Sequence, residues 1–200
     1  MSERQVESIG STSASLIERV RRNDQAAWRR MVRLYGPLVY YWCRQCELQA
    51  ADLSDIFQEV FRSVSVSIGD FRHGGSGQTF RGWLRTVTRN KLNDHFRQNR
   101  RVPLAAGGST ANLRWQQFVG DESGGQFIPM DDERRILVHR AIALLKTDFE
   151  ERTWKAFWRT AVDGLPSAQV ADELGMTPAA VRKSKSRVLQ RLREELGEDA

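Results

Sequence analysis

Residues 164–193 constrain the fold of this chain more than any other stretch. They predict a short helix, a tight turn and a longer basic helix. Apolar residues recur at helical spacing as far as Leu174. Gly175 follows, where a helix commonly ends in a left-handed residue. Thr177 can cap the second helix, and Pro178 sits at its first turn, where a missing N–H costs nothing. The pattern is typical of a helix-turn-helix.

The second helix of this pair separates apolar from basic residues. Between Arg182 and Arg193 it carries six basic residues and no acidic one. An inward stripe is expected from Val181, Ser184, Val188 and Leu192. The opposite, basic face suits the phosphates and guanine edges of a DNA major groove. The alternative is a solvated basic face on an ordinary helical hairpin.

A second basic helix is predicted at residues 80–101. Only Asp94 opposes its basic residues, and aromatic residues such as Trp83 and Phe96 are interleaved with them. Cations that follow a backbone, with rings on which bases stack, favour single-stranded nucleic acid. For the aromatic residues alone, a place in the core is the favoured interpretation. The basic residues are Arg81, Arg85, Arg89, Lys91, Arg97, Arg100 and Arg101.

The remaining pattern is also helical, so the predicted fold class is all-α. Helices are expected at residues 15–46 and 52–68, with Asp24 as a cap and Pro37 as an interruption or restart. Residues 69–78 are rich in glycine and read as a loop. The chain is therefore expected to form two small helical domains, the second a helix-turn-helix, joined by a flexible linker. Their expected bounds are 1–101, 102–130 for the linker, and 131–200.

Composition narrows the function classes. The net charge of +6 is concentrated in the first half of the chain. No apolar run is long enough to span a membrane and no signal-peptide core is present, which predicts a cytoplasmic protein without membrane insertion. Cys43 and Cys46 form a C-x-x-C pair on a helical pattern, for which a structural role is favoured over a metal or redox site. No nucleophile–base set, paired carboxylate site or phosphate loop is evident, so no enzyme activity, metal or cofactor is expected.

Three motifs together resemble the extracytoplasmic-function (ECF) group of bacterial sigma factors, group 4 of the sigma-70 family. They are residues 52–61 (DLSDIFQEVF), residues 80–97 (FRGWLRTVTRNKLNDHFR) and the helix-turn-helix. The similarity runs over residues 24–101 and 131–196. It implies a sigma region 2 domain and a region 4 domain that together direct core RNA polymerase to promoters.

The resemblance also implies roles for particular residues. In region 2, an acidic and amide face would bind the β′ clamp helices of core RNA polymerase, through Asp55, Gln58 and Glu59. The promoter −10 element would be met by Arg72, His73, Gln78, Arg85, Arg89, Asn90 and Arg97. The −35 element would be met by Thr177, Arg182, Lys183, Ser186 and Arg187. An anti-sigma factor is a further expected partner.

Two departures from the family pattern are visible. Lys185 stands where the recognition helix is often apolar, and Pro166 stands where a capping serine is common. Two other functions stay open from the residues: a stand-alone helix-turn-helix regulator that never contacts polymerase, and a thiol- or zinc-responsive interaction protein built on Cys43 and Cys46.

Overall fold

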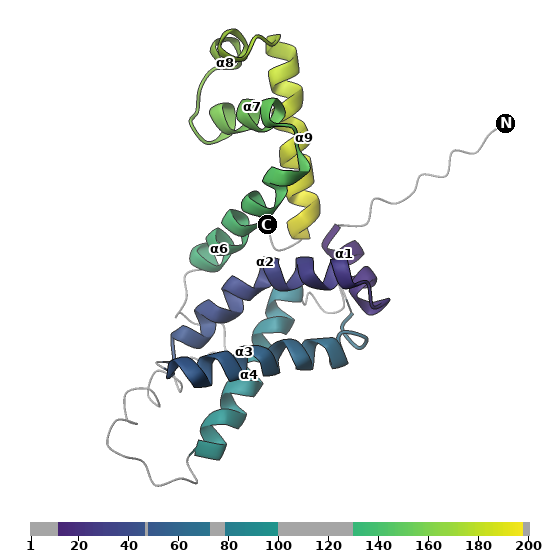
Figure 1. Cartoon of the computed structure of the whole chain (residues 1–200), viewed down its shortest axis with the longest axis vertical. Coiled ribbons are helices and arrows are strands. Elements are labelled where there is room, and N and C mark those ends of the chain that lie inside the picture. Colours follow the sequence, from purple (N-terminus) through teal and green to yellow (C-terminus); the bar gives the residue numbers. More distant parts are fainter. Residues whose placement is uncertain (1–11, 47, 73–78, 100–129, 198–200) are drawn as a thin grey trace, which may run out of the picture. The chain divides into compact units, whose positions relative to one another are not determined.

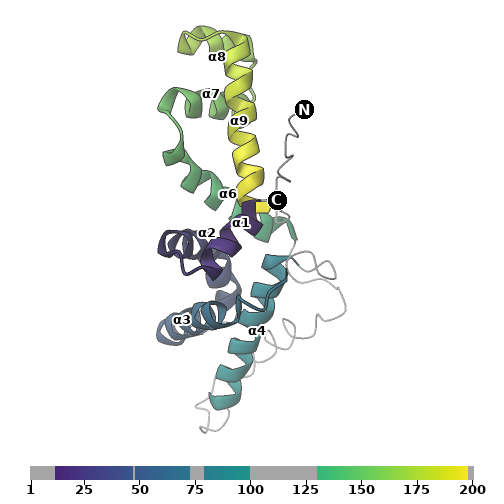
Figure 2. The same cartoon turned by 90° about the vertical axis from the view of Figure 1, so that its right-hand side faces the viewer.

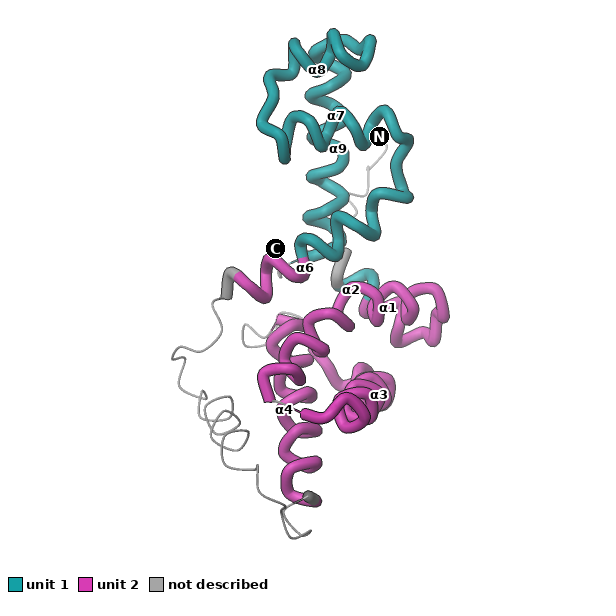
Figure 3. The backbone as a smooth tube through the Cα atoms, turned by 60° about the vertical axis from the view of Figure 1, so that its left-hand side comes forward, with its two compact units in different colours: residues 1–16, 138–198, 200 teal, residues 17–137, 199 magenta. Residues whose placement is uncertain are grey.

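A computed structural model of the 200-residue chain describes residues 12–46, 48–72, 79–99 and 130–197 (Figure 1). Over these residues the secondary structure is helical and contains no strand, which confirms the predicted all-α class. Two compact units are present (Figure 3). Ile17–Leu137 form the N-terminal unit and Val138–Glu198 form the C-terminal unit. The predicted linker lies outside the described residues except for Met130, and the predicted domain bounds stay predictions.

The N-terminal unit is built on one long helix, α2 (Gln25–Arg44). Asp24 caps it as predicted, because its Oδ1 accepts hydrogen bonds from the amides of Ala26 and Ala27 at 2.8 and 3.0 Å. Both α3 (Ala50–Ser67) and α4 (Phe80–Asn99) pack against α2 and against each other. The preceding helix is α1 (Thr12–Arg21).

The prediction that Pro37 interrupts or restarts this helix is wrong, because α2 continues through it. Pro37 is exposed, and so is Arg33, the residue whose carbonyl loses its amide partner. Water can satisfy that carbonyl, so the lost hydrogen bond is inexpensive on this face. The preceding residue, Gly36, is buried, and a Cβ there would lie 3.4 Å from the ring of Phe57. The missing side chain lets α3 approach α2 closely.

Aromatic side chains form much of the core between these helices. The rings of Tyr35 and Phe80 meet edge to face at 4.8 Å between centroids, and those of Phe71 and Phe80 at 5.6 Å. Phe80 is fully buried, whereas Trp83 and Phe96 are half-buried. The favoured core role for the aromatic residues of α4 therefore holds fully for Phe80 and partly for Trp83 and Phe96.

The C-terminal unit contains the second half of α6 (Met130–Leu145), a 3₁₀ turn (Lys146–Asp148), α7 (Glu151–Ala161), α8 (Ser167–Leu174) and α9 (Pro178–Leu196). Both α7 and α8 pack along α9 (Figures 1 and 2). One cluster joins Leu145, Trp154 and Phe157 to Val188. A second cluster joins Ala156 and the buried face of α8 to Val181.

The turn between α8 and α9 has the predicted chemistry. Gly175 ends α8 in the left-handed region, with φ of +59°, and the amide of Met176 donates to the carbonyl of Ala171 at 2.8 Å. Thr177 then caps α9, its hydroxyl oxygen accepting the amide of Ala180 at 3.1 Å. The helix-turn-helix is thus fixed locally by its sequence.

In the part of the chain that the structure describes, no helix is both long enough and apolar enough to cross a bilayer.

The two cysteines are buried within the N-terminal unit and are not joined in a disulfide. Burial raises the pKa of the Cys43 thiol to about 12, with a further contribution from Cys46. Burial alone raises the pKa of Cys46, also to about 12. Both thiols are therefore protonated at neutral pH, which makes them poor nucleophiles. These properties disfavour the thiol- or zinc-responsive alternative.

We expect native protein at neutral pH to resist a thiol reagent such as dithionitrobenzoate at both cysteines. The same sample should label fully once unfolded in guanidinium. Because the folded pKa values exceed the ordinary value of 9.0, the stability linked to these thiols is present below about pH 9 and is lost as the pH rises from there toward 12. Rapid labelling of the native protein would contradict this account.

Candidate nucleic-acid and partner interface

The basic face of α9 is exposed as predicted. Arg182, Lys183, Ser186 and Arg187 all project to solvent. Val181, Ser184 and Val188, from the opposite side, are at most 8% exposed. The apolar stripe of α9 therefore packs against α7 and α8, and a row of cations faces outward. Such a row can reach phosphates and guanine edges.

The structure gives a physical reason why a lysine, and not the expected apolar residue, stands at position 185. It is half-buried, and its Nζ donates a hydrogen bond to the carbonyl of Thr160 at 3.3 Å. Thr160 lies in the last turn of α7, where the carbonyl end of the helix dipole attracts a cation. The stem of Lys185 thus packs as an apolar residue would, while its charge is held by α7. Lys185 supports the recognition helix and is turned away from its basic face.

A residue that sequence reasoning missed braces the turn before α9. Arg152, on α7, donates from Nε and Nη2 to the carbonyl of Leu174 at 3.1 and 2.7 Å, and from Nη2 to the carbonyl of Gly175. These carbonyls at the end of α8 would otherwise lack helical partners. The partners are more than twenty residues apart, so no local pattern could reveal the contact.

The second basic face lies on α4. Arg81, Arg85 and Arg89 recur every fourth residue and share one side of the helix. Asn90 is exposed, and Arg97 is exposed and paired with Asp94 at 2.9 Å. The structure thus places the predicted −10 residues of α4 along one helix.

The predicted −10 loop begins at a braced turn. Arg72 is exposed, and its Nη1 donates to the carbonyl of Gly69 at 2.7 Å. Arg21 was not singled out in the sequence, yet its Nε donates to the carbonyl of Ile68 at 3.0 Å and its Nη2 to that of Phe71. It ties the end of α1 to the base of the loop. His73 and Gln78, the other two predicted loop residues, lie outside the described residues.

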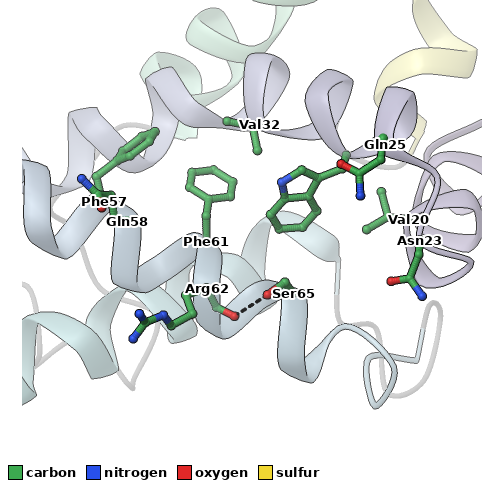
Figure 4. Close-up of a pocket in the computed structure, with 10 residues that line it drawn as sticks. Val20, Asn23, Gln25, Val32, Phe57, Gln58, Phe61, Arg62 and Ser65 are labelled. Carbon is green, nitrogen blue, oxygen red and sulfur yellow. Dashed lines mark hydrogen bonds between the residues drawn. The ribbon is translucent and has the colours of Figure 1, made fainter.

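The acidic and amide face lies on α3. Asp55 and Gln58 are exposed, and Glu59 is half-buried and pairs with Arg62 at 3.0 Å. Next to this face, a groove of about 470 Å³ opens between α2 and α3 (Figure 4). Gln58 and Arg62 stand at the groove, and its apolar lining includes Trp28, Phe57 and Phe61. We call it the α2–α3 groove.

No metal centre is suggested by the described part of the chain, where no three histidine, cysteine, aspartate or glutamate side chains gather. The α3 and α4 faces belong to the N-terminal unit, and the α9 face belongs to the C-terminal unit. Non-covalent binding of acidic nucleic acid and of a basic protein surface is the chemistry that these faces support.

Comparison with known protein families identifies one domain of the chain. Residues 31–102 match the Sigma-70 region 2 family. They include most of α2 and all of α3 and α4, and so contain the acidic face and the second basic face. The N-terminal unit therefore contains a sigma-70 region 2 domain.

Three relatives are similar to this chain over most of its length. The chain is 30% identical over 142 residues to the probable RNA polymerase sigma factor RfaY of Xanthomonas campestris. It is 26% identical over 176 residues to the ECF RNA polymerase sigma factor SigE of Mycolicibacterium smegmatis, and 24% identical over 186 residues to BldN of Streptomyces coelicolor. These matches cover 71%, 86% and 92% of this chain, but only 33%, 64% and 66% of the relatives. The chain is a distant homologue of ECF RNA polymerase sigma factors.

The inward position of Lys185 leads to a paired prediction. Replacing Arg187 with alanine should weaken binding to −35 duplex DNA by about tenfold, since one good base or phosphate contact is worth about 1–3 kcal/mol. Lys185→Met, which removes the same charge, should change the affinity by less than about threefold. Fluorescence anisotropy at fixed salt measures both. Equal losses in the two variants would show that Lys185 contacts DNA.

Proposed function

We propose that this chain is a sigma factor that binds core RNA polymerase and directs it to specific promoters. The observation that carries the proposal is the presence, on a sigma-70 region 2 scaffold, of an acidic face on α3 beside a basic face on α4. A helix-turn-helix with its own basic face follows in the chain. A subunit that joins a polymerase to DNA needs both kinds of surface.

The polymerase contact is assigned to Asp55, Gln58 and Glu59. Their oxygens are acceptors for a basic partner helix, such as those of the β′ clamp. The adjoining α2–α3 groove offers Phe57 and Trp28 to apolar side chains of the same partner. A buried aromatic anchor with a polar rim is the usual composition of a strong protein interface.

The −10 contact is assigned to α4 and the loop before it, through Arg72, His73, Gln78, Arg85, Arg89, Asn90 and Arg97. Cations along α4 would follow the backbone of the non-template strand while the promoter melts. Each captured base contributes about 1–3 kcal/mol where it stacks on a ring. Such capture offsets the loss of base pairing as the duplex opens.

The −35 contact is assigned to α9, through Thr177, Arg182, Lys183, Ser186 and Arg187. A helix presented by a preceding short helix enters the major groove with its N-terminal half. Thr177 is held as a cap, so its contact with DNA would use the hydroxyl proton that the cap leaves available.

This role involves no catalysis by the chain, since sigma factors are non-catalytic subunits of the polymerase. The site of action would be the cytoplasm, where polymerase and chromosome meet. An anti-sigma factor is part of the proposal as a partner that would compete for the polymerase-binding surfaces.

Promoter-specific run-off transcription is the test of this function. The chain, added to core polymerase with a library of genomic promoters, should yield discrete transcripts that neither component yields alone. A stand-alone regulator would instead bind duplex DNA equally well with or without core enzyme. Absence of both initiation and core binding would rule out the sigma function.

Charge reversal on the α3 face should separate polymerase binding from folding. Asp55→Lys should weaken binding to core polymerase by about tenfold or more, because it places a cation against a basic partner surface. Asp70→Lys, the same reversal at an exposed residue just after α3, is the matched control and should bind normally. Binding is measured by surface plasmon resonance and folding by circular dichroism. Equal binding by the two variants would remove Asp55 from the interface.

A further inference from the structure

A buried carboxylate lies against the basic face of α4. Glu133, in the first half of α6, is 4% exposed and belongs to the N-terminal unit. Its Oε1 accepts a hydrogen bond from the indole Nε1 of Trp42 at 2.7 Å. Its two oxygens also face Arg81 and Arg85, at 3.8 Å from the Nε of Arg81 and 3.9 Å from Nη1 of Arg85. We call this group of four residues the Glu133 clasp.

The Glu133 clasp provides the buried carboxylate with a hydrogen bond and two nearby cations. A buried carboxylate is costly unless it is paired and hydrogen-bonded. The short bond from Trp42, itself fully buried, is charge-assisted, and two guanidinium groups balance the negative charge. Trp42 and Glu133 are 91 residues apart, so the contact brings together distant parts of the chain.

The two arginines of the clasp belong to a surface with another use. Arg81 and Arg85 lie on the same side of α4 as Arg89, and Arg85 is among the residues assigned to the −10 element. With Glu133 in place, the side chain of Arg81 is 14% exposed and that of Arg85 is 34% exposed. The carboxylate therefore occupies the position from which a phosphate would meet these two cations.

The neighbourhood also contains a second negative charge. Burial raises the pKa of Tyr41, and the charges of Asp132 and Glu133 raise it further. The first half of α6 thus presents two carboxylates to this end of α2. Asp132 is paired with Arg135 on its own helix, at 3.7 Å, whereas Glu133 faces Arg81 and Arg85.

We propose that Glu133 is an internal competitor of single-stranded DNA for Arg81 and Arg85. This inference rests on the proposed function, because it assumes that α4 binds the melted strand. In the free chain the carboxylate neutralises the two arginines and lowers the affinity of α4 for DNA. A DNA strand that binds both arginines displaces the carboxylate of Glu133, which is then solvated by water.

The arrangement suits displacement. Both arginine contacts exceed hydrogen-bond distance, so they are electrostatic attractions that a bidentate phosphate contact can replace. Of the three contacts in the clasp, the one from Trp42 has hydrogen-bond geometry, so displacement of the carboxylate breaks a single hydrogen bond. The clasp therefore restrains DNA binding by α4 in the free chain and still permits it.

Replacing Glu133 tests the competition directly. Glu133→Gln keeps an oxygen that can accept the Trp42 bond but removes the charge. The full chain with this substitution should bind a short mixed-sequence single-stranded DNA about tenfold more tightly than the wild type, a size typical of coupled equilibria. Asp132→Asn, which removes the same charge one residue earlier, is the matched control and should change affinity less than about twofold.

The indole N–H of Trp42 gives a second readout that needs no substitution. In ¹⁵N-labelled wild-type protein its NMR signal should move as the DNA is added, because Glu133 leaves the bond. In Glu133→Gln the signal should start elsewhere and move less. These results, with the tenfold gain in affinity, support the clasp.

Contrary outcomes are equally distinct. Equal DNA affinities of wild type and Glu133→Gln would overturn the competition, and promoter-specific transcription by the wild type would show that the sigma function stands without it. If Glu133→Gln fails to fold, a Trp42 signal that stays unmoved in DNA-saturated wild-type protein overturns the competition. Absence of promoter-specific initiation with core polymerase would overturn the sigma function itself.

Discussion

The N-terminal unit depends on the close approach of α3 to α2 at Gly36. The ring of Phe57 lies within van der Waals distance of the place where a Cβ would stand, so a side chain larger than a methyl group would push α3 away. That approach sets the position of everything α3 carries, including Asp55 and Gln58 on its outer side and the lining of the α2–α3 groove. The acidic and amide face of α3 and the helical core are thus positioned by one packing distance.

Charged side chains have two different roles in the structure. The cations on the basic face of α9 are exposed to solvent, whereas a few charged residues of the two units are turned inward and each is anchored to a specific group. Lys185 ends on a helix carbonyl, and Glu133 ends on an indole and two guanidinium groups. Inward charges of this kind hold one arrangement of helices, because leaving any of them without a partner would be costly.

Local chemistry explains what could be predicted from the sequence. The αL glycine at Gly175, the cap at Thr177 and the alternation of Val181 with Arg182 involve neighbouring residues, and each was predictable. The cap at Asp24 was found for the same reason. Pro37 was misjudged because its cost depends on which face of α2 meets solvent, and that is a property of packing. The braces made by Arg21 and Arg152, and the bond between Trp42 and Glu133, join residues far apart in sequence, so no periodicity reveals them.

Under the proposed function, the brace that Arg152 makes to the end of α8 has a consequence for the choice of promoter. With the turn held by α7, the orientation of α9 does not depend on the side chains that face DNA. Exposed residues such as Arg182 and Arg187 can then be exchanged with little loss of stability, since surface substitutions usually change it by less than about 0.5 kcal/mol. Under the proposed function, exchanging these exposed residues would change the DNA sequence that α9 recognises while the scaffold of the helix-turn-helix stays the same.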